Sequence, residues 1–540
     1  MGAATVLVTP GGAFALTSAI AIAIEDLTVL SLSQAPVVSV RTALGLTLQR
    51  LIVACVGGKD AVGVAIALGG IIAGVTIRDN VIIAPIAVQK LDAAANDDSK
   101  TAFLLTAVLH IDDNVMLCER QAVALTGTVL HLMTTRIAGN EIMRCDAGAI
   151  TTLGLCGPGA SMKVCDNSLN VTGPGITAGV DGLWIADNKL IASTQRNVVP
   201  AGAGVTLRTG LDPNGTNDCQ ILANQIRGFA GAGIAIQSPA GELIVKLNII
   251  SGCGNGIVSD DEAKAGRASI ENNHITEIGG ADERTGVVVG IHLQRGDVVT
   301  VAGNTIRDIG QDAVRAPLRA GIAAVGVRRL RASGNDVSEV APAGDYVGLA
   351  AGIMLRAPYA LAEITNNRVE RDTQGATLGT RSQWYALLVD QPLADRVFSR
   401  VGNFAAVRID DARTLVFGGR RPYVATAVTE TDAAGVVAAR TASVSVLGNV
   451  LSASGSTPAV AIESSGDCLF NDNRCELVGR QSPAVKIAAS VALVNANRVR
   501  GGEASIDLTG SKQTAVLGNV TTGPIVPKLP PDWEQLNLRG

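Results

Sequence analysis

The residues of this chain that are best suited to chemistry occupy equivalent positions in short apolar segments. Arg356 ends the segment GIMLR, and Asp390 ends the segment ALLVD. Successive side chains of a strand point to opposite faces, so the residues between the inward apolar ones face outward. This alternation predicts one outer lane that contains Arg356, Asp390 and Asp260, with His292 on the lane beside it.

Two interpretations of these residues stay open. Strands in adjacent layers lie about 5 Å apart, so Arg356 and Asp390 are expected to be neighbours that can form a local catalytic site. The same two residues also make an ordinary solvated ion pair, which contributes little free energy. An outward His292 is equally explained as an ordinary surface residue.

The elements that position these residues follow from a repeat. An asparagine recurs along nearly the whole chain, with an apolar alternating segment on each side, as in VTIRDNVII and LWIADNKLI. Between the asparagines, a small residue opens an apolar–x–apolar segment, as in GIAI and GIHL. Each repeat therefore carries three short strands. The asparagines are Asn80, Asn114, Asn140, Asn167, Asn188, Asn224, Asn248, Asn273, Asn304, Asn335, Asn367, Asn403, Asn449, Asn473, Asn497 and Asn519.

This repeat predicts an all-β fold. Asparagine tolerates the left-handed backbone conformation that a sharp corner requires. Equivalent asparagines in successive layers can also stack and hydrogen-bond along the axis. Aromatic residues make up only 3% of the chain, which suits stacked coils of small and β-branched residues. We predict a single-stranded right-handed parallel β-helix, a solenoid of about sixteen or more coils.

The repeat resembles the pectate-lyase-like superfamily of right-handed parallel β-helices. The opening TVLVTPGGAFALTSAIAI is also similar to the first coil of those proteins. The resemblance covers almost the entire chain and implies the fold. It selects no activity, because the superfamily includes lyases, hydrolases, esterases, epimerases, phage tailspikes and non-catalytic shafts.

The resemblance also implies where an enzyme of this fold would act. In similar enzymes the substrate groove follows the outer lanes, where carboxylates and arginines of adjacent coils face an acidic sugar chain. Here Arg356 and Asp390, with Asp260 or His292, would supply that site, and calcium would be needed only by a lyase. The NTD, GHG and RIK motifs of polygalacturonase-like enzymes are absent from the sequence, and so are the WIDH and Arg-x-Pro-x-x-Arg motifs of pectate lyases.

The most distinctive surface is expected in loops 346–423, which contain eight of the fourteen aromatic residues. Trp384 and Tyr385, with Arg371 and Arg381, would bind a polysaccharide or a protein partner there. The alternative is that this aromatic cluster packs the long loops against the coils. We expect a parallel β-helix over residues 1–520 with long insertions around 340–440. The tail 521–540 would cap the last coil with Trp533 and Leu536.

Composition argues against several classes of protein. The formal net charge of −4 gives no basic surface for nucleic acid. The nine cysteines contain no CxxC pair, so we interpret them as buried apolar residues and expect no metal site. The apolar segment 61–77 is interrupted by glycines and is better explained by buried strands than by a membrane span. The first residues do not resemble a signal peptide, and we expect a fragment of a larger protein.

Three functions remain compatible with the sequence. The first is a non-catalytic β-helical shaft or interaction module of a larger bacterial or phage-tail-like assembly. The second is a lyase or hydrolase that acts on an acidic polysaccharide in a groove on the outer face of the β-helix. The third is a binding domain that holds a glycan or a protein through loops 346–423. The substrate or partner, the oligomeric state and the localisation are left open.

Overall fold

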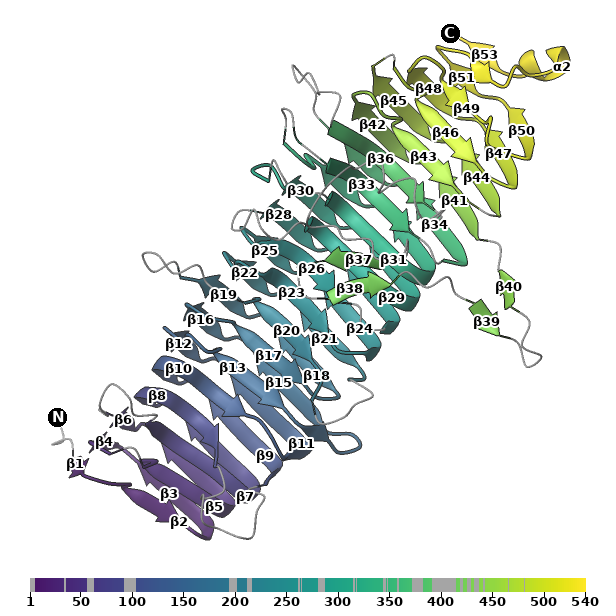
Figure 1. Ribbon diagram of the computed structural model, residues 1–540. Coiled ribbons are helices and arrows are strands. Elements are labelled where there is room, and N and C mark those ends of the chain that lie inside the picture. The colour runs from purple at the N-terminus through teal and green to yellow at the C-terminus, as the bar shows by residue number, and fades with distance from the viewer. Residues whose placement is uncertain are drawn as a thin grey trace. The chain divides into compact units, whose positions relative to one another are not determined.

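The computed structural model describes most of the chain. Its described residues are 5–540 apart from 34, 56–62, 92–102, 194–201, 211–215, 261–262, 264, 280–286, 314–315, 317, 343–345, 347, 357–358, 372–381, 391–413, 418–420, 425–428, 432–436, 440–441, 465 and 480. The chain divides into two compact units, Met1–Ile249 and Ile250–Gly540. Figure 1 shows strands stacked side by side in each unit.

The first unit is built almost entirely of strands. They are β1 (Thr5–Thr9), β2 (Phe14–Leu16), β3 (Ala19–Glu25), β4 (Leu27–Ser31), β5 (Val38–Gln49), β6 (Ile52–Cys55), β7 (Val64–Arg78), β8 (Val81–Lys90), β9 (Leu104–Asp112), β10 (Val115–Leu125), β11 (Val129–Ala138), β12 (Glu141–Met143), β13 (Ile150–Leu153), β14 (Leu155–Cys156), β15 (Ser161–Cys165), β16 (Ser168–Val171), β17 (Ile176–Gly179), β18 (Leu183–Ala186), β19 (Lys189–Ala192), β20 (Val205–Arg208), β21 (Cys219–Leu222), β22 (Gln225–Arg227), β23 (Ala232–Gln237) and β24 (Ala240–Lys246). Strand β25 (Ile249–Ser251) begins at the boundary between the units.

In its described residues, the second unit has the same construction and one short helix. Its strands are β26 (Asn255–Ser259), β27 (Ala265–Glu271), β28 (His274–Ile278), β29 (Val287–Ala302), β30 (Thr305–Ile309), β31 (Leu318–Ser333), β32 (Asp336–Ser338), β33 (Gly348–Arg356), β34 (Leu361–Thr365), β35 (Arg368–Glu370), β36 (Ser382–Asp390), β37 (Thr414–Phe417), β38 (Arg421–Val424), β39 (Thr429–Thr431), β40 (Val437–Ala439), β41 (Ser443–Leu447), β42 (Val450–Ser454), β43 (Val460–Glu463), β44 (Asp467–Asn471), β45 (Arg474–Val478), β46 (Val485–Ala488), β47 (Val491–Asn495), β48 (Arg498–Gly501), β49 (Ile506–Asp507), β50 (Gln513–Leu517), β51 (Val520–Thr521), β52 (Ile525–Val526) and β53 (Leu538–Arg539). The helix is α2 (Pro531–Glu534).

The strand pairing confirms the predicted β-helix. In the first unit, β15 pairs in parallel with β18, and β18 pairs with β21. In the second unit, β44 pairs in parallel with β47, and β47 pairs with β50. When a strand pairs with the third strand that follows it in the chain, the backbone has completed one turn between the two. Each of these coils therefore carries three strands, as the repeat predicts. Strands β37 and β38, and β39 and β40, form two separate antiparallel hairpins.

A ladder of asparagines runs through each unit, and all of its members except the partly buried Asn537 are buried. In the first, Nδ2 of Asn80 donates to Oδ1 of Asn114 at 2.8 Å, and Asn224 donates in the same way to Asn248 at 3.0 Å. Each of these amides also donates to a backbone carbonyl, as Asn80 does to Leu48. The side-chain amide therefore satisfies backbone groups that the corner would otherwise bury without a partner. The members are Asn80, Asn114, Asn140, Asn167, Asn188, Asn224 and Asn248 in the first unit, and Asn273, Asn304, Asn335, Asn367, Asn449, Asn473, Asn497, Asn519 and Asn537 in the second.

The prediction that asparagine itself takes the left-handed backbone conformation is wrong. The residue before the asparagine takes it, with φ of 55° at Asp79 and 65° at Gly139. The corner needs a left-handed backbone conformation and a side-chain amide, and two consecutive residues provide them. One residue supplies the strained backbone, and the following asparagine supplies an amide whose oxygen and nitrogen both bond along the ladder.

The ladder differs from the predicted set at two places, and the coil before the first predicted asparagine has no asparagine rung. Leu51 holds the corresponding position in an early coil, and its N–H donates to Oδ1 of Asn80 at 2.8 Å. Asn367 bonds directly to Asn449 at 3.0 Å, so no asparagine rung stands between them. Asn403, which lies outside the described residues, was therefore wrongly predicted as an intervening corner. The sequence pattern also missed Asn537, whose Oδ1 accepts from Asn519 at 2.9 Å.

The C-terminal tail continues the coil. Strand β53 pairs with β51, and Asn537 adds the last rung of the ladder. Trp533 and Leu536, which were expected to cover the last coil, are 36% and 53% exposed. Among the described residues, no helix combines the length and apolar composition that a transmembrane span needs. Most of segment 61–77 lies in the largely buried strand β7, as its interruption by glycines predicts.

Replacement of a central rung tests how much the ladder stabilises the fold. Asn140→Ala removes the donors to Ile111 and Ala138 and leaves the N–H of Asn114 without its acceptor. We expect the free energy of unfolding to fall by about 3–5 kcal/mol, because several buried polar groups lose their partners at once. Chemical denaturation followed by circular dichroism measures the change. The control Asn170→Ala removes an exposed asparagine of β16 and should stay within about 0.5 kcal/mol of the unchanged chain. Equal effects of the two would contradict a structural ladder.

Candidate functional site

The predicted neighbours Arg356 and Asp390 are placed side by side. Strands β33 and β36 pair in parallel, with Arg356 opposite Asp390 in the register. The same column continues through Val325 of β31 to Gln294 of β29. The backbone register therefore confirms the expected adjacency, which is the part of the candidate site that strand alternation alone could predict.

The lane that carries Arg356 is covered rather than open. Arg356 is only 8% exposed, Gln294 5% and Val325 0%. Asp260 follows β26, is partly buried and accepts a hydrogen bond from the N–H of Ala263 at 3.2 Å. Strands β29 and β31 separate β26 from the strand of Arg356, so the structure does not bring Asp260 to Arg356 and Asp390.

His292 does not lie on the surface, in contrast to the prediction. It is 3% exposed and stands in a column between Val258 and Ala323, followed by Met354. Burial lowers the pKa of His292 to about 4, and a hydrogen bond with the backbone of Ser259 opposes this shift. The imidazole is therefore neutral at pH 7.

The physical reason is a second apolar layer on the outside of these coils. Its buried residues contact one another over four consecutive coils, with Tyr385 and Val258 packed against its margin. We call this set the outer apolar layer. It consists of Val287, Val289, Leu318, Ala320, Ala323, Leu349, Ala351, Met354 and Leu388. Alternation correctly separates the two faces of a strand, but it cannot show that both faces are buried.

The predicted binding residues Trp384 and Arg371 are instead parts of a buried cluster with Tyr346 and Arg319. The guanidinium carbons of Arg319 and Arg371 lie 4.7 Å and 5.6 Å from the ring centre of Tyr346. Arg371 also lies 5.8 Å from the ring of Trp384. All four side chains are 4% exposed or less. We call these residues the arginine–aromatic cluster.

Hydrogen bonds fix the arginine–aromatic cluster to the backbone. Nε1 of Trp384 donates to the carbonyl of Val340 at 2.8 Å, and the hydroxyl of Tyr346 donates to the carbonyl of Gln383 at 3.0 Å. Arg319 donates to the carbonyl of Ala313, and Arg371 to that of Pro342. The rings therefore pack internally in this structure and are not free to stack on a sugar.

Burial dominates the electrostatics of this cluster. Burial, with a smaller contribution from the nearby Arg371, lowers the pKa of Arg319 to about 10, while Tyr346 opposes the shift. Burial also lowers the pKa of Arg371 and raises that of Tyr346. The aromatic faces thus offset part of the cost of burying two guanidinium groups. The sequence did not nominate Arg319, because nothing in the sequence of its strand, β31, indicates that Tyr346 packs against its guanidinium group.

The remaining predictions concern Tyr385, Arg381, the cysteines and possible metal ligands. Tyr385 is partly buried against the outer apolar layer, and Arg381 lies outside the described residues. All nine cysteines are free, and all but Cys156 and Cys165 are buried, which agrees with their predicted apolar role. Within the described part of the chain, no three His, Cys, Asp or Glu residues are placed to hold a metal ion.

Two variants of Tyr346 separate its hydroxyl from its ring. Tyr346→Phe keeps the ring between the two guanidinium groups and loses the hydrogen bond to Gln383, so we expect a loss of about 1 kcal/mol in unfolding free energy. Tyr346→Leu also loses the contacts with both cations, and we expect a loss of about 3 kcal/mol. Denaturation midpoints measure both. If Tyr346→Phe and Tyr346→Leu destabilise the fold equally, the cation–π contacts do not contribute to stability.

The buried histidines predict acid sensitivity. The pKa values of His292 and His131 are both lowered to about 4 by burial, below the ordinary value of 6.5. The unfolded chain binds protons first as pH falls, so stability present above pH 6.5 is lost between about 6.5 and 4, by about 3 kcal/mol for each histidine. His292→Leu should flatten the pH dependence of the denaturation midpoint. The exposed His274→Asn is the control and should leave the profile as it is in the unchanged chain. The same slope in His292→Leu would refute this account.

A protein-family model agrees with the fold. The family model "Right handed beta helix region" matches residues 156–337 and, in a second overlapping match, 214–386. The chain is similar to the A-module of a mannuronan C-5 epimerase from Azotobacter vinelandii, with 11% identity over 72% of this chain and 88% of the module, at a TM-score of 0.31. It is also similar to a PL6 family alginate lyase, with 12% identity over 97% of this chain and 98% of the lyase, at a TM-score of 0.17.

These two similarities are too weak to support an argument about activity. A search of curated proteins finds no match. The fold instead rests on the parallel pairing within each unit, the asparagine ladders and the family model. Taken together, these observations show that the fold is a right-handed parallel β-helix.

Proposed function

We propose that this chain is a non-catalytic β-helical shaft or interaction module of a larger bacterial or phage-tail-like assembly. The observation that carries the proposal is the asparagine ladder, which bonds each coil of a unit to the next through buried amides. Such a ladder resists local opening, because an opened corner leaves several buried polar groups without partners. Rigidity of this kind is what a spacer within an assembly needs.

The nominated site residues also support a structural role. Arg356 and His292 are nearly enclosed, and the neutral His292 belongs to a buried column. Arg371 and Trp384 donate hydrogen bonds to the carbonyls of Pro342 and Val340, which follow β32, so both side chains are bound within the coils. In this proposal a polysaccharide or protein partner binds at loops 346–423, and the arginine–aromatic cluster anchors those loops.

A lyase or hydrolase for an acidic polysaccharide is the second candidate function. One observation favours it, namely the register that places Arg356 beside Asp390 on neighbouring strands. An enzyme would need the covered lane to open, because Arg356 is 8% exposed. The shaft needs no such change.

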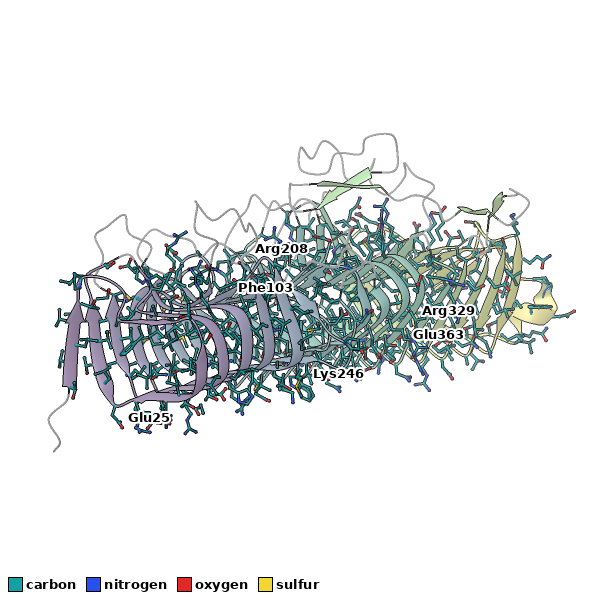
Figure 2. All side chains as sticks on the ribbon, turned by 90° about the horizontal axis from the view of Figure 1, so that it is seen from below. Glu25, Phe103, Arg208, Lys246, Arg329 and Glu363 are labelled. Carbon is teal, nitrogen blue, oxygen red and sulfur yellow. The ribbon has the colours of Figure 1, made fainter. Side chains whose placement is uncertain are left out.

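Assays on a panel of polyuronates, with and without calcium, separate the two functions. For a shaft we expect neither unsaturated products that absorb in the ultraviolet nor new reducing ends. The variants are Arg356→Ala and, as a control, Arg329→Ala, which removes an exposed arginine of β31 (Figure 2). Turnover that persists in Arg329→Ala and disappears in Arg356→Ala would refute the shaft and establish the enzyme.

A further inference from the structure

One outer face of the first unit carries a column of uncharged side chains. Parallel pairing of β5, β7, β9, β11 and β14 aligns one residue from each strand on successive coils. The column reads Thr42, Ile71, Leu105, Leu130 and Leu155. Its inward neighbours, such as Ile72 and Leu104, are buried, so the column faces outward.

A second column lies beside the first, two residues further along each strand. Ile20 of β3 pairs with Leu44 of β5, and Leu44 pairs with Ala73 of β7. Ala107 and Leu132 follow at the same offset on β9 and β11. At Leu132 the register between β11 and β9 shifts, and this irregularity also exposes Met133. The second column, like the first, contains no charged residue.

These two columns form a large exposed apolar surface, which we call the apolar face together with Phe103 and Met133. The exposed fractions are 70% for Ile20, 48% for Leu44, 45% for Ile71, 47% for Phe103, 39% for Leu132, 58% for Met133 and 39% for Leu155. Together these side chains expose on the order of 600 Å² of apolar area, as much as the largest apolar patch of a typical monomer. Phe103 is labelled in Figure 2.

We propose that the apolar face joins two copies of this chain. A stable interface buries about 800 Å² per partner, of which about 60% is apolar, so the apolar face supplies the apolar part of such an interface. Neither column contains a charged residue, and the exposed Arg41 precedes Thr42 outside both columns, so the columns themselves can meet their own copy without like-charge repulsion. Its side chains also repeat at the rise of one coil, about 4.8 Å, and a second stack of coils presents the same interval.

The neighbouring face of the same unit is a weaker candidate for self-association. On the strands after the ladder corner, Ile52, Val81 and Ile83 are 46%, 39% and 44% exposed. The column of Val81 continues through Val115 to the charged Glu141 within two coils. This face therefore provides the matched control for the experiment.

The test is the mass of the 540-residue chain in solution, measured by light scattering after size-exclusion chromatography over a range of concentrations. We expect a dimer that dissociates on dilution. Ile71→Lys places a charge in the centre of the apolar face and should weaken self-association by about tenfold or more, since a buried unpaired charge costs several kcal/mol. Ile83→Lys introduces the same charge at a residue of nearly the same exposure, 44% against 45%, and should remain dimeric.

Circular dichroism and thermal melting check that both variants are folded. A monomeric unchanged chain would overturn the proposal, whether it stays alone or binds lipid vesicles through this face. Equal weakening by Ile71→Lys and Ile83→Lys would also overturn it. A shaft and an enzyme can both dimerise, so the mass in solution is independent of the result of the polyuronate assays.

Discussion

The constraint on which each unit depends is that a polar backbone must turn a buried corner once per coil. The turn brings carbonyls such as those of Leu48 and Ile77 into an environment without water. Only a side chain with both a donor and an acceptor can satisfy them and also bond to the next layer, and asparagine has both on a short stem. The same requirement recurs from coil to coil, so the asparagine recurs from Asn80 onward, whereas Leu51 holds this position in an early coil.

The other repeated feature, the glycine that opens many of the third strands, follows from close packing of the coils. A Cβ on Gly290 would lie 2.6 Å from Cγ2 of Ile306 and 2.7 Å from the carbonyl oxygen of Gly321. Neither atom can move far, because Ile306 is buried in the core and Gly321 belongs to the paired strand of the next coil. The small residue is thus a steric requirement of the solenoid.

The two units differ in whether the apolar side chains on the outer faces of their coils are buried. The second unit buries its outer apolar layer, and nearby the arginine–aromatic cluster ties the corner and loop residues to the strands. In the first unit the apolar face remains exposed over several coils. Arg356 and His292, which the sequence nominated for chemistry, are buried in the second unit, whereas the apolar face that we propose as an interface has no charged residue in either of its columns.

The sequence by itself determined the fold, because a requirement that recurs in every coil leaves a periodic signal. It also determined that Arg356 and Asp390 are neighbours, since strand register follows from that period. Only the tertiary structure decided that His292 is buried, that Trp384 packs on Arg371, and that Asn367 bonds to Asn449 across 82 residues. These facts depend on side chains brought together by irregular loops and on packing against the outside of the coils. Neither has a period, so alternation along a strand cannot report them.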